Sequence, residues 1–331
     1  MKPGKLPFKL SYIIFTFILF GIVACNTIQK KEKTMETKVE QSETFFKLSL
    51  AQWSLHNAIK YDKTLDPIDF AQKAKELGFE GLEYVSDLYI PNLAEGDDPQ
   101  KAMQNLLDTL KIKSEMYGMK NVLIMIDGEG DLATPNEEER NHAVENHKKW
   151  VDAAAFLGCH SIRVNLSGSN DVAIWTVAAV SGLKQLSEYA EQKNINIIVE
   201  NHGGLSSNAE FLSQVITNVG MDNCGTLPDF GNFCIKIETA EDGESRCVEE
   251  YDAYKGMEIL MKQAKAVSAK SYDFDDSGKE TTLDYERILK TVKKAGYTGF
   301  IGVEYEGDRL SEVEGIIATR DLLINLGKQL N

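Results

Sequence analysis

Three short stretches of the sequence end or interrupt an apolar run with residues that can carry chemistry. "IIVENHGG" (197–204) runs from three β-branched residues into a glutamate, an asparagine and a histidine. "LPDFGNF" (227–233) contains an aspartate, and "IGVEYEG" (301–307) ends in two glutamates. Carboxylates and imidazoles transfer protons or bind metal ions in proteins. Whether these groups act together depends on the elements that position them.

From residue 46 onward, short apolar runs alternate with amphipathic stretches. The runs predict eight strands, at 47–53, 81–86, 121–127, 161–168, 195–201, 224–230, 266–274 and 300–307. Helical patterns include 66–78, 146–158, 180–194, 284–296 and a final helix over about 311–328, and several end in a glycine or asparagine suited to a left-handed cap. This alternation implies parallel strands with right-handed crossovers. Eight units in roughly 285 residues fit a (β/α)₈ TIM barrel, with an open doubly wound sheet as the alternative.

Polar residues recur at the carboxyl ends of nearly all these strands, which favours the barrel because its strand ends converge on one site. In chain order they are Gln52 and Ser54, Glu83, Asp127, Arg163 and Asn165, Glu200 and His202, Asp229 and Asn232, Lys270 and Tyr272, and Glu304 and Glu306. Residues two apart share one face of a strand, so these pairs are expected to point at the barrel mouth. Candidate substrate-binding residues are Glu83, Arg163, Asn165, His202, Asn232 and Lys270.

Three of these carboxylates, Glu200, Asp229 and Glu304, follow the fifth, sixth and eighth strands. Burying each unpaired would cost several kcal/mol. A divalent cation removes this cost, and oxygen ligands favour Mg²⁺ or Mn²⁺ over softer metals. A single carboxylate in such a place is usually a surface cap or an ion-pair partner. The set of three, with none beginning a helix, predicts a metal site.

In this order and in register with the strands, the three stretches resemble the motifs of the xylose-isomerase-like barrel superfamily, of the sugar phosphate isomerase/epimerase type. The resemblance covers about 47–328. It implies that Glu200, Asp229 and Glu304 bind a divalent metal, and that Glu200 and Glu304 also move protons on either face of a sugar. It further implies that Asn232 contacts the substrate.

The chain departs from the superfamily near the end of the seventh strand, where relatives usually carry a histidine as fourth metal ligand. "VSAKSYDFD" (267–275) offers Ser268 and Lys270 there instead. Three possibilities follow. The metal keeps three protein ligands and water, His202 or Asp273 substitutes, or the Lys270 ammonium replaces the charge of the metal.

The leading functional hypothesis is a sugar isomerase or epimerase that abstracts a proton next to a carbonyl with the help of a metal. Two alternatives stay open: a lyase or hydratase acting on 3-oxo-glycosides, and a sugar-binding lipoprotein without catalysis. The missing histidine supports the last of these. An exported protein is expected to meet a non-phosphorylated sugar or a glycoside, because sugar phosphates are cytosolic metabolites. The oligomeric state is not predicted.

The first residues have the pattern of a bacterial lipoprotein leader. Three lysines precede an apolar run that is short for a membrane span, and "IVAC" ends at Cys25. We expect a signal peptide at 1–24, lipidation of Cys25, a flexible polar tether at 25–45 and the barrel at 46–331. The protein would then be exported and anchored to a membrane by its lipid alone, facing the periplasm.

The charge and the cysteines narrow the partners and the compartment. Removing residues 1–24 removes three lysines and no acidic residue, which takes the net charge from −15 to −18. Such a charge argues against nucleic acid, whose phosphates are bound by clustered lysine and arginine. Cys234 and Cys247 flank a polar stretch and could form a disulfide or remain two free thiols.

Overall fold

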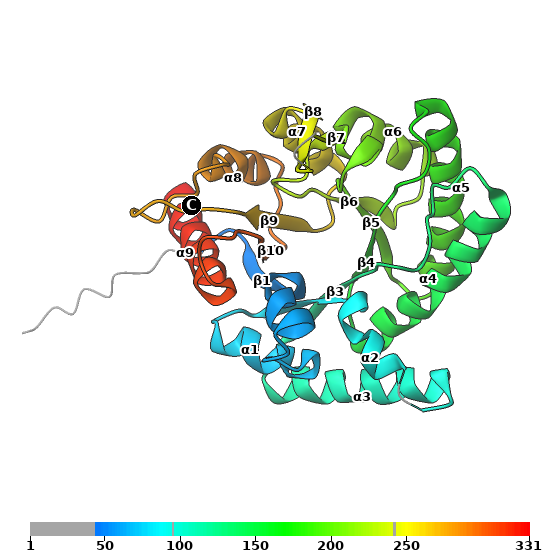
Figure 1. The fold of residues 1–331 in the computed structure, drawn as a ribbon, viewed down its shortest axis with the longest axis horizontal. Coiled ribbons are helices and arrows are strands. Elements are labelled where there is room, and N and C mark those ends of the chain that lie inside the picture. Colours follow the sequence, from blue (N-terminus) through cyan, green and yellow to red (C-terminus); the bar gives the residue numbers. More distant parts are fainter. Residues whose placement is uncertain (1–43, 95, 241–242) are drawn as a thin grey trace, which may run out of the picture. The chain divides into compact units, whose positions relative to one another are not determined.

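A ring of parallel strands surrounded by helices makes up most of the described residues (Figure 1). The computed structural model describes residues 44–94, 96–240 and 243–331. The predicted signal peptide and Cys25 lie outside these residues, as does all of the predicted tether except its last two residues. Among the helices that are described, none is long and apolar enough to cross a membrane.

The eight predicted barrel strands are all present. They are β1 (Lys47–Ala51), β2 (Gly81–Val85), β3 (Lys120–Met125), β4 (Ser161–Val164), β5 (Asn196–Glu200), β6 (Cys224–Leu227), β9 (Val267–Ser271) and β10 (Phe300–Tyr305). They pair in the order β6-β5-β4-β3-β2-β1-β10-β9, and every pairing is parallel. Two parallel bridges, Thr226 with Ala264 and Asp229 with Ser268, join the β6 and β9 edges. The predicted (β/α)₈ barrel is therefore confirmed.

Helices cover the outside of the ring. They are α1 (Phe70–Glu76), α2 (Ile90–Leu93), α3 (Pro99–Met116), α4 (Glu137–Leu157), α5 (Val172–Glu191), α6 (Ala209–Val219), α7 (Ala253–Leu260), α8 (Tyr285–Lys294) and α9 (Glu312–Leu330). Side chains such as Asn136 and Asp171 cap their first turns by accepting backbone N–H bonds. The predicted left-handed residues at helix ends include Gly78 and Gly158, with φ of 83° and 78°.

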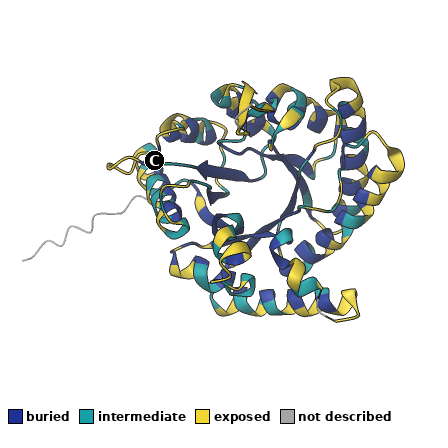
Figure 2. Cartoon of the chain, in the orientation of Figure 1, coloured by how far each residue is buried: buried dark blue, intermediate teal, exposed yellow. Residues whose placement is uncertain are grey.

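The strands are buried on both faces, whereas each helix keeps an exposed outer face (Figure 2). Leu50 of β1 and Val303 of β10 are examples, because both side chains are fully buried. The neighbouring strands β1 and β2 approach closely at Gly81. A Cβ atom added to Gly81 would lie 2.8 Å from the Cβ atom of Ser49. Burial of these apolar runs supplies the free energy that holds the mouth residues in place.

A second, two-stranded sheet interrupts the barrel after β6 and was not predicted. The antiparallel strands β7 (Cys234–Thr239) and β8 (Ser245–Glu250) form a hairpin in the stretch that the sequence presented only as polar. Cys234 and Cys247 form a disulfide across its base, which decides between the two possibilities left open above. Cys159 and Cys224 are buried free thiols.

Candidate active site

Three carboxylates meet at the carboxyl end of the barrel strands. Glu200 is the last residue of β5, Asp229 lies two residues beyond β6, and Glu304 is near the end of β10. Each offers one oxygen atom, and these three oxygens lie within 4.8 Å of one another. The side chains are almost completely buried, with Asp229 fully so. The convergence expected from their places after parallel strands is what the structure shows.

In this carboxylate cluster, formed by Glu200, Asp229 and Glu304, two oxygen atoms share a single hydroxyl donor. The Ser268 hydroxyl lies 2.6 Å from Asp229 Oδ2 and 3.0 Å from Glu304 Oε2. A hydroxyl carries one proton, so it can donate to only one of the two carboxylates at a time. The two oxygens that share this hydroxyl, Asp229 Oδ2 and Glu304 Oε2, are therefore suited to accept a further proton or to bind a cation.

Burial has the corresponding effect on acidity. It raises the pKa of Asp229 to about 7 and that of Glu304 to about 8, while the nearby Lys270 ammonium opposes both shifts. Two acids with such raised pKa values are short of compensating positive charge. Three oxygen donors with this deficit fit a divalent cation, which prefers carboxylate oxygens. The site could therefore hold a divalent metal.

Lys270 enters the cluster from β9 and is 2% exposed. Its Nζ atom lies 2.9 Å from Glu306 Oε2 and 4.0 Å from Glu304 Oε2. Burial alone would lower the pKa of Lys270, but Glu304, Asp229 and Glu306 together raise it well above its ordinary value. The side chain therefore stays a buried ammonium ion and does not extend to solvent.

On the other side of the cluster, Arg163 of β4 joins two carboxylates. Its Nε atom lies 2.9 Å from Glu200 Oε2, and its Nη1 donates to Asp127 Oδ1 at 2.9 Å. Asn165 donates to the same Asp127 oxygen at 3.0 Å. Arg163 and Asn165, predicted as substrate-binding residues, thus share one partner, and Arg163 also fixes the orientation of Glu200.

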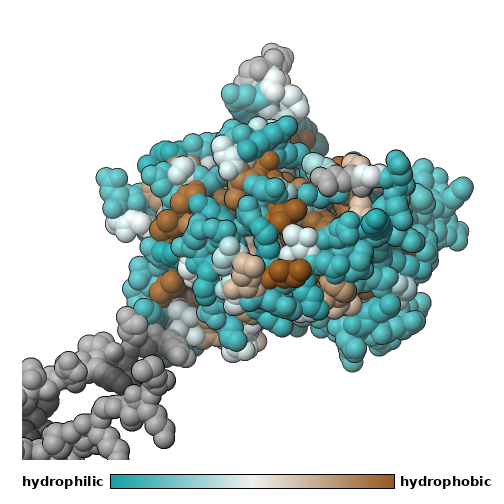
Figure 3. Space-filling view, turned by 90° about the horizontal axis from the view of Figure 1, so that it is seen from below, coloured by the Kyte–Doolittle hydropathy of each residue, from teal (hydrophilic) through white to brown (hydrophobic). Residues whose placement is uncertain are grey.

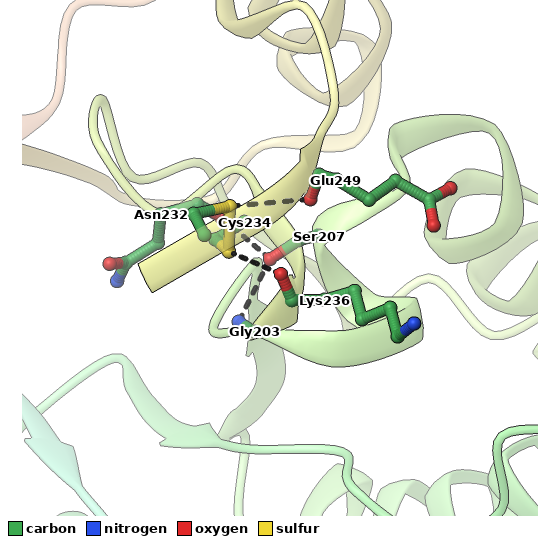
Figure 4. The surroundings of a disulfide bond; sticks show 7 residues. Gly203, Ser207, Asn232, Cys234, Lys236 and Glu249 are labelled. Atoms are coloured by element: carbon green, nitrogen blue, oxygen red, sulfur yellow. Dashed lines mark hydrogen bonds between the residues drawn. A yellow bond between two sulfur atoms is a disulfide. The ribbon is translucent and has the colours of Figure 1, made fainter. Parts of the chain in front are cut away.

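Asn232 holds Glu200 from the loop after β6. Its Nδ2 atom donates to Glu200 Oε1 at 2.9 Å. Its own carbonyl accepts hydrogen bonds from Asn201 at 3.0 Å and from the Ser207 hydroxyl at 2.8 Å. Figure 4 shows that the disulfide at Cys234 lies next to this network. The base of the hairpin and one wall of the site are therefore built from the same short segment.

His202 at the mouth differs from what strand alternation predicts. β5 ends at Glu200, so His202 lies in the following turn, where its backbone N–H donates to the Ser206 hydroxyl. His202 is exposed and interacts electrostatically with Asp127 and Glu306 across the mouth. It does not belong to the cluster of potential metal ligands found in the described chain.

A similar departure occurs after β1. The chain turns into a 3₁₀ helix over Gln52–Leu55, so strand alternation stops at Ala51. Gln52 and Ser54 are fully buried and bind neighbouring elements: Gln52 donates to the Tyr89 hydroxyl, and Ser54 to the Val303 carbonyl. The expectation that both point at the mouth is therefore wrong. Trp53, which the sequence analysis missed, instead helps to lower the pKa of Glu306 against the effect of burial.

Two further candidates lie apart from the cluster. Asp273 is paired with Arg309 and is not among the clustered ligands. Glu83 is 1% exposed and accepts a hydrogen bond from Ser49, while its Oε2 atom has no partner in the described structure. Burial raises the pKa of Glu83 to about 7. A role for Glu83 in substrate binding stays a prediction.

Comparison with known proteins agrees with this architecture. The family described as "Xylose isomerase-like TIM barrel" matches residues 71–326. The chain belongs to this family. The superfamily predicted from the three motifs is thereby confirmed.

Solved structures of several other proteins are similar in fold. A 3-keto-D-glucoside 4-epimerase from E. coli is 13% identical, with a TM-score of 0.63, covering 84% of this chain and 98% of that one. A xylose isomerase-like TIM barrel protein from Mycobacterium smegmatis, solved with magnesium, is 15% identical, with a TM-score of 0.60, covering 86% and 98%.

A curated relative matches a short segment only. The C-glycoside deglycosidase alpha subunit of Arthrobacter globiformis is 37% identical over 54 residues. That segment is 16% of this chain and 15% of the relative.

Proposed function

We propose that this protein is a carbohydrate isomerase or epimerase that abstracts a proton next to a carbonyl group of a non-phosphorylated sugar. The observation that carries the proposal is the convergence of Glu200, Asp229 and Glu304 at the barrel mouth. A bound divalent cation, with Mg²⁺ or Mn²⁺ best suited to three carboxylates, would act there as a Lewis acid toward the carbonyl oxygen.

Glu304 is suited to take the proton. Its Oε2 atom faces Ser268 and Lys270, and this is the only Glu304 oxygen for which a hydrogen bond is found within the described residues. An unbonded carboxylate oxygen can reach a substrate C–H bond without first giving up a donor. Glu200 is held on both oxygens, by Asn232 and by Arg163, and it would return a proton to the other face of the sugar carbon.

Lys270 and Asn232 would bind and orient the substrate. The Lys270 ammonium is fixed by Glu306 and is close enough to the cluster to donate a hydrogen bond to a sugar oxygen. A carbohydrate that lacks phosphate fits this mouth, because the two cationic side chains beside the cluster, Arg163 and Lys270, already pair with carboxylates. A sugar phosphate would need an unpaired arginine or lysine.

A second candidate reaction starts from the same proton transfer. A lyase or hydratase acting on 3-oxo-glycosides would remove the proton and then expel a leaving group. The short segment similar to a C-glycoside deglycosidase subunit supports this alternative. A sugar-binding lipoprotein without catalysis would not need Glu304 with a free oxygen, since neutral amides and aromatic rings suffice to bind sugars.

Proton exchange tests the common step. Keto-sugars and 3-keto-glycosides are incubated with the protein in D₂O, and NMR follows deuterium entering the carbon beside the carbonyl. We expect exchange with the wild type and a loss of about 10²–10⁴-fold in Glu304→Gln and Glu200→Gln. Products without net elimination indicate an isomerase or epimerase, and release of the aglycone indicates the lyase. Binding of these sugars without any exchange would overturn the proposal in favour of the sugar-binding protein.

We also propose that the protein is an exported lipoprotein anchored through Cys25. The leader motif "IVAC" supports this, and the Cys234–Cys247 disulfide suits an oxidising compartment. Cys25→Ala should release the protein from membranes or block its processing, measured by fractionation and by mass spectrometry of the N-terminus. Normal maturation and membrane attachment of the variant would contradict the proposal.

A further inference from the structure

A hollow of about 560 Å³ lies beside the mouth, between the segments that follow β1 and β2. Apolar side chains form much of its lining, among them Ile59, Leu65, Leu88 and Ile90. Its size is that of small-molecule sites in proteins. Because it is built by segments that leave the carboxyl ends of two barrel strands, it lies at the same end of the barrel as the carboxylate cluster.

Contacts connect this hollow to the cluster. Lys60 and Asp87 line the hollow and pair with each other. Lys60 Nζ lies 6.0 Å from the centre of the Trp53 ring, and Trp53 is one of the side chains that lower the pKa of Glu306 against the effect of burial. Glu306 binds Lys270 at 2.9 Å. Lys60, Trp53, Glu306 and Lys270 thus form a series of neighbouring side chains that leads from the hollow to the site of proton transfer.

The lining indicates what the hollow can bind. It contains two lysines and two aspartates, so its formal charge is zero and it offers no excess of positive charge to a phosphate. Ile90 is 55% exposed at this position, so part of the apolar lining of the hollow faces solvent. Apolar surface interrupts the hydrophilic surface on the face that carries α1, α2 and α3 (Figure 3). An uncharged, apolar group would bury these side chains.

We propose that the hollow is a second subsite, which takes the apolar aglycone of a glycoside while the sugar ring reacts at Glu200 and Glu304. This inference rests on the function proposed above and specifies its substrate class. A free monosaccharide is hydroxylated at almost every carbon and has no apolar part to reach beyond Trp53. A glycoside with an aromatic or hydrocarbon aglycone has two parts of different chemistry, as this mouth does.

The test compares two unreactive ligands that share one sugar, phenyl β-D-glucoside and methyl β-D-glucoside, by titration calorimetry. Burying the phenyl ring should make the phenyl glucoside bind at least about 10-fold more tightly. Ile90→Asp and Leu65→Ser place polar groups in the lining and should lower this preference by about 10-fold. Ile112→Asp is the matched control, because Ile112 is 58% exposed on α3 and is not part of the lining. It should leave the preference unchanged.

The outcomes separate the two proposals. An equal affinity for both glucosides, or a phenyl preference that survives both lining variants, would overturn the subsite. Deuterium exchange with a 3-keto-glucoside is measured in parallel on the wild type. Exchange without a phenyl preference would refute the subsite and keep the proposed function. A phenyl preference that the lining variants remove, without exchange of any keto-sugar, would refute the proposed function and leave an aglycone-binding hollow.

Discussion

The mouth of the barrel and the hairpin beside it break the usual distribution of residues in opposite ways. In the mouth, charged side chains are buried, and Lys270 and Glu304 are only 2% and 4% exposed. In the hairpin, apolar side chains are exposed, and Ile237 and Val248 are 62% and 52% exposed. The two regions are joined within a few residues, because Asn232 belongs to the mouth and Cys234 begins the hairpin.

The difference shows where each region obtains its stability. Buried strands surround the mouth, and their apolar burial can offset the cost of desolvating several charges. The hairpin has no fully buried residue in either described strand, and an isolated two-stranded hairpin is at best marginally stable in water. The disulfide supplies a constraint that packing does not. The mouth therefore keeps buried charges at a cost in folding free energy, which the surrounding apolar burial offsets. The hairpin depends on its disulfide instead.

The largest effect is expected when the mouth loses a carboxylate. Glu304→Gln should reduce turnover about 10²–10⁴-fold because it removes the proposed base. Its melting temperature should not fall, since Lys270 keeps its 2.9 Å partner Glu306 and the change replaces an acid whose pKa burial already raises to about 8. Glu286→Gln, on the exposed surface of α8, should alter neither activity nor melting temperature. A joint loss of activity and of melting temperature in Glu304→Gln would indicate a structural role.

Removing the buried cation should have the opposite effect on stability. Lys270→Met leaves Glu304 and Glu306 without their ammonium partner, and breaking a buried ion pair costs about 3–5 kcal/mol. Urea unfolding measures the loss. Lys290→Met is the matched control, because that lysine forms an exposed pair on α8 and should change stability by less than about 0.5 kcal/mol.

A double variant keeps this prediction testable if Lys270→Met does not fold. Lys270→Met/Glu306→Gln removes both members of the 2.9 Å pair and should recover part of the lost stability. If the double variant is as unstable as Lys270→Met, the charge of Glu306 is not the cause of the loss.

Glu83 predicts a pH dependence of stability. Burial raises its pKa from 4.5 in a reference state to about 7 in the fold, so the folded chain holds this proton more tightly. The resulting stabilisation is complete below about pH 4.5 and is lost as the pH rises to about 7, amounting to about 3 kcal/mol. Glu83→Gln stays neutral, so its free energy of unfolding should fall less than that of the wild type between pH 5 and pH 8. Parallel curves would contradict the shift.

A divalent metal should compensate the negative charge of the carboxylate cluster and so stabilise the fold. Mg²⁺ or Mn²⁺ at about 100 times its dissociation constant would stabilise the fold by about 2.7 kcal/mol, and a chelator would remove this gain. Asp229→Asn should reduce the response, because it removes one of the three oxygen donors. Melting curves with and without metal, together with elemental analysis of the purified protein, test it. Equal metal-induced shifts in the wild type and the variant would place the metal elsewhere.

The barrel and its cluster could be predicted because both follow from regular geometry. Apolar runs of strand length repeat eight times, and parallel strands in a barrel bring their carboxyl ends together, so Glu200, Asp229 and Glu304 had to meet. Prediction failed where the chain leaves regular structure. Trp53 lies near Glu306 because a 3₁₀ helix interrupts the strand alternation after β1. No local pattern in "AQWSLH" (51–56) predicts that helix.

Long-range pairing was also beyond the sequence. Arg163 reaches both Asp127 and Glu200, and this depends on the register of three neighbouring strands. The hairpin was missed because its strands alternate weakly and bury nothing, so the burial signal that reveals a strand is absent. Only the two cysteines hinted at it, and their spacing alone left the disulfide undecided.

The smallest effect is therefore expected from opening the hairpin. In Cys234→Ser/Cys247→Ser the constraint at its base is lost, and trypsin should cut more rapidly at Lys236 or Arg246, followed by mass spectrometry. The barrel should be affected little. Its melting temperature should change by less than about 2–4 °C, which corresponds to about 1 kcal/mol in a chain of this size. Asn232 should keep its hydrogen bond to Glu200, because Asn201 and Ser207 bind the Asn232 backbone carbonyl independently of the disulfide.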